Sequence, residues 1–111
     1  MDLARFNKVI IDQLEYTESL LASKGDEYAK TVDRLANFKK AAALQDTTPV
    51  AALLGMLAKH IVSISDMCVS KADEPLERWI EKITDSINYL ILLRALVEED
   101  FENEPNRNKS A

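Results

Sequence analysis

Three acidic side chains in the last third of the chain have the type and spacing of metal ligands. Glu77, Glu81 and Asp85 are each four residues apart, so on a helix they form one row that turns by only about 40° per step. Carboxylate oxygens are the ligands that Mg²⁺ and Mn²⁺ prefer. We therefore predict that this acidic row binds a divalent cation, while the solvated face of an ordinary surface helix remains the alternative.

The acidic row continues into side chains that are not typical of a helix surface. Beyond Asp85, helical steps lead to Asn88 or Tyr89, then to Leu92, and then to Leu96. The face is therefore expected to become buried within two turns. This pattern predicts that the acids lie at the edge of a groove between subunits, with Asn88 and Tyr89 as further candidates for ligand contact.

A second group of candidates belongs to a helix that we expect over residues 26–45. Asp26 and Glu27 open it, and their carboxylates either cap the helix and complement its dipole or provide further metal ligands. Asn37 and Phe38 combine an amide with an aromatic ring, a pair that can recognise and stack on a nucleobase. A core phenylalanine beside an exposed asparagine has the same spacing.

Two lysines and the single histidine complete the candidates. Lys39 and Lys59 could balance phosphate charge. His60 lies next to an apolar stripe, where it either contacts a ligand or is a satisfied interface side chain. Cys68 is the only cysteine, and we expect a buried, inert thiol in a reducing compartment. No serine–histidine–acid arrangement or glycine-rich phosphate loop is present, which disfavours a covalent enzyme intermediate.

Hydrophobic periodicity predicts that four helices position these groups. Their sharpest boundary is Thr48-Pro49, a cap followed by a proline in the first turn, whereas Gly25 is expected to end the first helix and Asp73 to cap the last. Short loops between long helices favour antiparallel neighbours. We expect an all-α, four-helix antiparallel bundle with helices over about Asp2–Ser23, Asp26–Gln45, Pro49–Lys71 and Asp73–Asp100.

Composition limits the possible partners. The 111 residues suit one domain over 1–101 with a polar tail over 102–111, and the net charge of −5 without a basic block excludes duplex nucleic acid. No apolar run approaches the roughly 20 residues of a membrane span, and the N-terminus lacks signal-peptide character, so we expect a cytoplasmic protein. Residues 87–97 are apolar almost all round the helix, which predicts a homo-oligomer.

Several of these segments together resemble a known family. They look like small phage proteins of a nucleotide-modification-associated domain family, which are similar to the MazG-like all-α nucleoside triphosphate pyrophosphohydrolases. The resemblance spans about residues 20 to 98. It is carried by Lys24-Gly-Asp-Glu-Tyr-Ala, Leu35-Ala-Asn-Phe-Lys39, Lys59-His60, Glu74-Pro-Leu-Glu77 and Asp85-Ser-Ile-Asn-Tyr-Leu90.

The resemblance implies a dimer or tetramer that holds Mg²⁺ between paired acids on facing helices. Water would attack a nucleoside or deoxynucleoside triphosphate and release a monophosphate and pyrophosphate. Glu81 and Asp85 match the second acidic motif, with the glutamate four residues before the aspartate instead of three. Asp26 and Glu27 match the first motif, which normally has a third acid where this chain has Lys30.

Three functions follow as expectations. In the first, a pyrophosphohydrolase, Glu27, Glu81 and Asp85 are catalytic metal ligands, assisted by Asp26 or Glu77. In the second, the same pocket binds or sequesters a nucleotide without hydrolysis and tolerates the missing acid. In the third, an acidic helical protein docks on or inhibits a host factor in the host cytoplasm.

Overall fold

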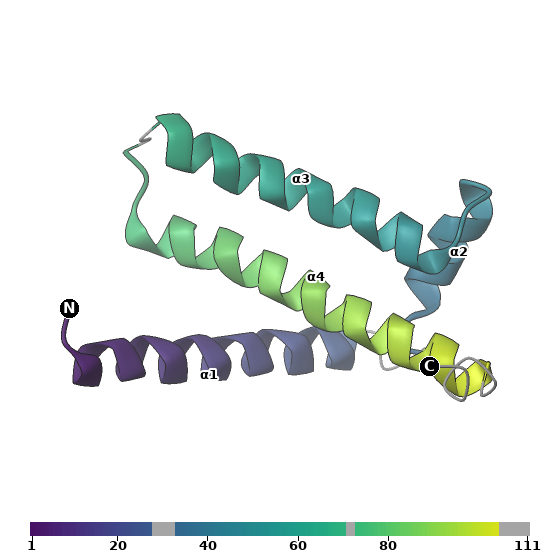
Figure 1. Ribbon diagram of the computed structural model, residues 1–111, viewed down its shortest axis with the longest axis horizontal. Helices are drawn as coiled ribbons and strands as arrows, with labels where there is room; N and C mark the ends of the chain where they lie inside the picture. Colours follow the sequence, from purple (N-terminus) through teal and green to yellow (C-terminus); the bar gives the residue numbers. More distant parts are fainter. Residues whose placement is uncertain (28–32, 71–72, 105–111) are drawn as a thin grey trace. The chain divides into compact units, whose positions relative to one another are not determined.

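The computed structural model describes residues 1–27, 33–70 and 73–104, and every regular element in these ranges is an α-helix. The prediction of an all-α protein with four helices is confirmed for these residues. The chain forms two compact units, Met1–Arg34 and Leu35–Ala111. The helices are α1 (Leu3–Glu27), α2 (Ala36–Leu44), α3 (Pro49–Ser70) and α4 (Leu76–Asn103) (Figure 1).

Helix α1 is the one helix among residues 1–27 and 33–34 of the first unit. Asp2 begins it, because the backbone N–H of Arg5 donates to Asp2 Oδ1 at 2.8 Å, as expected for an N-terminal cap. The helix then continues through Gly25 to Glu27, so the prediction that Gly25 ends it and Asp26 caps the next helix is wrong. The physical reason is that Gly25 keeps a helical backbone instead of the left-handed conformation that terminates helices.

Helix α2 is shorter than the predicted second helix, and residues 28–32 lie outside the described part of the chain. Its end is well defined. The N–H of Thr47 donates to the carbonyl of Ala42 at 2.9 Å, and the N–H of Asp46 donates to that of Ala43. Asp46 has a φ of 53°, so it occupies the left-handed position of a Schellman motif. An aspartate, and not Gly25, therefore takes the special backbone conformation that ends a helix.

The starts of α3 and α4 differ in how well the sequence predicted them. Thr48 caps α3 as expected, since the N–H of Ala51 donates to Thr48 Oγ1 at 3.2 Å and Pro49 is the first helical residue. Helix α4 instead begins after Pro75, which is extended with φ −65° and ψ 154° and offers no side-chain cap. The prediction that Asp73 caps α4 is wrong because the extended proline separates the two.

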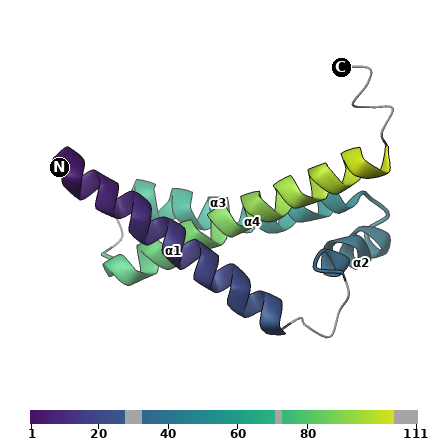
Figure 2. The ribbon, with the colours of Figure 1, turned by 90° about the horizontal axis from the view of Figure 1, so that it is seen from below.

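The second unit is an antiparallel pair of long helices, α3 and α4, with α2 packed at one end (Figures 1 and 2). Apolar side chains from all three helices and from the turn before α2 meet at that end. Leu53 is the most deeply buried of them, at 0% exposure. The buried cluster consists of Leu35, Phe38, Leu53, Leu57 and Leu96.

The hydrophobic spacing in the sequence predicts an inward stripe along α3, and the structure confirms it in part, with Leu53 and Leu57 buried and Ile64 half-buried. The predicted stripe consists of Val50, Leu53, Leu57, Ile61, Ile64 and Cys68. Further along, Ile61 and Cys68 are exposed, and the inward positions are taken by His60 and Met67. Steps of three and four residues from Leu57 lead through Ile64 to these two residues, so the buried face moves around the helix to one side of the predicted stripe. The prediction of a buried Cys68 thiol is wrong.

From the sequence we expected no segment able to span a membrane, and α3 is the helix against which this expectation is compared. Among the described residues it is the one helix long and apolar enough to do so by length and composition. Four of its side chains are buried within the chain, and a core helix of a soluble protein passes the same test.

Helix α4 extends to Asn103, three residues beyond the predicted end. Its apolar second half is buried only in part within one chain, since Leu96 is buried whereas Leu90, Ile91 and Val97 are exposed. That a second subunit covers these exposed side chains of α4 remains a prediction. Residues 105–111, most of the predicted polar tail, lie outside the described residues.

The core gives a direct test of this packing. We expect Leu53→Ala to lower the free energy of unfolding by about 2–5 kcal/mol, because it leaves a cavity in the best-packed position. The adjacent Leu54→Ala is the matched control: Leu54 is 60% exposed, so its change should stay within about 0.5 kcal/mol. Urea unfolding followed by circular dichroism measures both values. Equal losses for the two variants would contradict the packing.

Candidate functional site

The acidic row runs along α4 from solvent toward the core. Glu77 and Glu81 are exposed, whereas Asp85, one turn further, is half-buried. Beyond it, Tyr89 and Leu92 pack against the hydrophobic cluster. The row therefore enters the interior at Asp85, as the sequence predicted.

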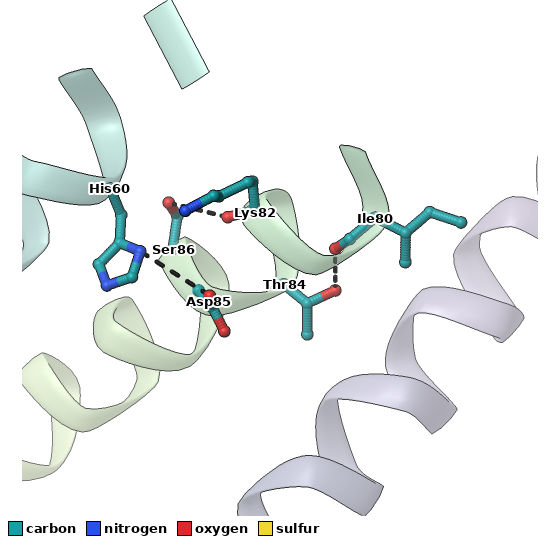
Figure 3. A network of polar contacts seen from close by, with 6 residues as sticks. All are labelled: His60, Ile80, Lys82, Thr84, Asp85 and Ser86. Carbon is teal, nitrogen blue, oxygen red and sulfur yellow. Dashed lines mark hydrogen bonds and ion pairs between the residues drawn. The ribbon is translucent and has the colours of Figure 1, made fainter. Parts of the chain in front are cut away.

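Asp85 faces the single histidine across the α3–α4 pair. The Nδ1 atom of His60 lies 3.8 Å from Asp85 Oδ2, and their side chains are 24% and 22% exposed (Figure 3). This separation exceeds a direct hydrogen bond, so the contact is an electrostatic one that depends on a protonated imidazole. A carboxylate from α4 and an imidazole from α3 thus lie side by side, both partly buried, at the seam, by which we mean the line where the two helices pack together.

Two aromatic rings extend this pair toward the core. The ring of Tyr89 lies 5.0 Å from that of His60, tilted by 37°, and 6.5 Å from that of Phe38 in an edge-on arrangement. Phe38 belongs to the buried cluster, while its neighbour Asn37 is exposed. The three rings form a continuous line from the seam into the interior, so they fix the position of the imidazole.

The lysines have different surroundings. Lys39 Nζ lies 2.6 Å from Glu99 Oε1, which joins α2 to α4, and both side chains are partly exposed. Such an ion pair contributes little to stability but orients both groups. Lys59 is exposed on α3. The sequence did not indicate Glu99 as the partner of Lys39.

The pairing of His60 with Asp85 was also missed, although a signal was present. The two residues lie roughly equally far from the connection between α3 and α4. Since neighbouring helices joined by a short loop run antiparallel, positions equidistant from the loop come side by side. This geometry could have been derived from the predicted helix boundaries alone.

Asn88, about one helical turn beyond Asp85 on α4, is an unusual buried polar side chain. Asn88 is 3% exposed, and neither its amide nitrogen nor its amide oxygen has a hydrogen-bond partner among the described residues. The two buried hydroxyl groups of α4 do form hydrogen bonds. Thr84 donates to the carbonyl of Ile80 at 2.6 Å, and Ser86 donates to the carbonyl of Lys82 at 3.4 Å. Asn88 is thus an exception among the buried polar side chains of this helix.

The capacity of the site for a metal ion can be judged from its donors. Within residues 1–27, 33–70 and 73–104, no group of three or more His, Cys, Asp or Glu side chains is arranged to hold one. Asp85 and His60 offer two donors at the seam. The predicted ligands Asp26 and Glu27 lie in the last turn of α1, and their side chains fall outside the described part of the structure.

No protein-family model matches the chain, and no curated protein or solved structure shows significant similarity to it. The resemblance to the MazG-like pyrophosphohydrolases therefore rests on the sequence segments alone.

Asn88 provides a test of the site. We expect Asn88→Leu to raise the free energy of unfolding, since an unsatisfied buried amide group costs about 1–3 kcal/mol. If Asn88 contacts a ligand, the same variant should also lose the thermal stabilisation given by that ligand. Asn7→Leu, at an exposed position of α1, is the control and should change stability little. A destabilised Asn88→Leu variant would contradict the expectation.

Proposed function

We propose that the chain is a metal-dependent pyrophosphohydrolase of nucleoside or deoxynucleoside triphosphates. The observation that supports it is the position of Asp85 where α3 and α4 meet, beside the imidazole of His60, which in turn lies against the ring of Tyr89. A carboxylate partly withdrawn from water binds a cation more strongly than one in bulk solvent. The motif around Asp85 also carries the resemblance to the pyrophosphohydrolases.

In this proposal, Glu81 and Asp85 bind Mg²⁺ or Mn²⁺ together with Glu27, while Asp26 or Glu77 assists. The cation polarises the phosphoryl oxygens and activates a water molecule, which attacks the triphosphate and releases pyrophosphate. No covalent intermediate with the protein forms.

Other side chains would bind the rest of the nucleotide. Lys39 or Lys59 balances the charge of the phosphates, and His60 holds Asp85 in place. The candidates for contact with the base are Asn37, Phe38, Asn88 and Tyr89.

The proposal also includes a homo-oligomer in the cytoplasm. In the described part of the chain the acidic side chains do not form a complete metal site. Acids from a second copy, or those at the end of α1, would supply the missing ligands.

A second candidate is a protein that binds a nucleotide without hydrolysing it. Two observations favour it: Asp85 already has His60 as an electrostatic partner, and no third donor for a metal stands beside them among the described residues. A phosphate group could bind near His60 and the lysines without a complete metal site.

Measurement of pyrophosphate release tests the first candidate. With a panel of triphosphates and Mg²⁺ or Mn²⁺, we expect release from at least one, and at least a 100-fold lower rate for Asp85→Asn because it removes a ligand charge. Asp66→Asn, at an exposed position of α3, is the matched control and should retain the full rate. No release from any triphosphate would refute hydrolysis.

A binding measurement separates the two candidates. Isothermal titration with a triphosphate that is not hydrolysed should show binding in both cases. Binding that survives Asp85→Asn and requires no divalent cation would support the second candidate. Absence of binding to every nucleotide, with or without Mg²⁺, would refute both.

A further inference from the structure

Helix α4 carries a second apolar row on the side opposite its contact with α3. Its members alternate in steps of four and three residues, which is the heptad spacing of helices that pack along one another. In Figure 3, Ile80 of this row lies on the side of α4 away from His60. The outer row consists of six apolar side chains and one arginine: Leu76, Ile80, Ile83, Ile87, Leu90, Arg94 and Val97.

The outer row is largely uncovered. Leu76, Ile80, Ile83, Leu90 and Val97 are between 37% and 68% exposed. Seven positions at heptad spacing extend over about 30 Å of helix. Contiguous exposed apolar surfaces of this kind mark protein–protein interfaces, and the heptad period indicates that the partner is another long helix.

We propose that α4 of a second copy of this chain covers the outer row, and that the two helices run antiparallel. The charges on the row select this orientation. A parallel pair would place Arg94 beside Arg94 of the partner subunit and Glu98 beside Glu98 of the partner subunit, and like charges opposite one another are unfavourable.

An antiparallel pair centred between Ile83 and Ile87 removes this conflict. Ile83 then packs on Ile87 of the partner subunit, and Arg94 lies over Leu76 of the partner subunit. Arg94 there meets the acids at the start of α4, where Asp73 and Glu77 are exposed. Arg94 now pairs with Glu98 at 3.0 Å on the surface, a weak contact that can rearrange.

This inference specifies the subunit contact of the oligomer in the proposed function, and it does not depend on nucleotide binding. The outer row lies on the opposite side of α4 from Asp85. Its variants therefore change assembly through side chains that take no part in the proposed chemistry. Failure of pyrophosphate release would leave the proposed contact unaffected.

Sedimentation of the full chain at micromolar concentration tests the contact. We expect a dimer for the wild type and at least a 100-fold weaker dissociation constant for the double variant Ile83→Glu, Leu90→Glu, with unchanged helical circular dichroism. Val62→Glu, at an exposed position of α3, is the matched control and should remain dimeric. A monomeric wild type, or a double variant that dimerises as tightly as the wild type, would overturn the proposal.

Disulfide cross-linking tests the orientation with no charge introduced into the row. In a Cys68→Ser background, Leu76→Cys combined with Arg94→Cys should give a disulfide that joins position 76 of one subunit to position 94 of the other, identified by mass spectrometry of the linked peptides. Leu76→Cys alone should remain uncrosslinked in an antiparallel dimer. Efficient cross-linking of that single variant shows parallel helices and overturns the proposed orientation.

Discussion

The packing of α4 along α3 determines how the candidate chemical groups on these two helices lie relative to one another. This contact buries Leu53 and Leu96 at one end and brings Asp85 next to His60 further along. A rotation of α4 by one residue position would turn Asp85 away from His60 and expose Leu96. The site and the core are consequently two parts of one interface, and the hydrophobic part holds the polar part in register.

The same packing explains how α4 can be apolar on opposite sides. The side that faces α3 carries Tyr89, Leu92 and Leu96, and the opposite side carries the outer row. One antiparallel neighbour covers only one of these sides. The all-round apolar composition that the sequence showed over residues 87–97 is therefore the sum of two separate apolar faces.

The sequence predicted local features of the fold better than features that depend on tertiary packing. Thr48 and Pro49 were assigned correctly because the cap and the proline act within one turn. Gly25 and Asp26 have the residue types of a helix end and a helix start, yet the backbone continues through both, since residue type sets a preference and not an outcome. The predicted second helix was too long for the same reason, because its start was placed at Asp26, which lies in α1, whereas α2 begins at Ala36.

For the candidate site, the acidic row could be predicted because its members lie on one helix. The burial of Asp85 was predicted from the residues that follow it. The contact with His60 was not predicted, although both residues lie about equally far from the connection between α3 and α4 and an antiparallel pair brings such positions together. Asn88 was recognised as a candidate by its place in the row, but its lack of a hydrogen-bond partner is visible only in three dimensions.

The order of contacts along the chain has a consequence for how the second unit folds. Helices α3 and α4 are consecutive, so their pairing closes only a short connection, and helical hairpins of this kind form quickly. The contacts of Phe38 with Tyr89 and of Lys39 with Glu99 join residues more than 50 positions apart, and closing so long a loop is entropically more demanding. The contacts of α2 with α4 therefore become favourable once α4 has paired with α3, because the pairing leaves only the short turn between α2 and α3 to be closed.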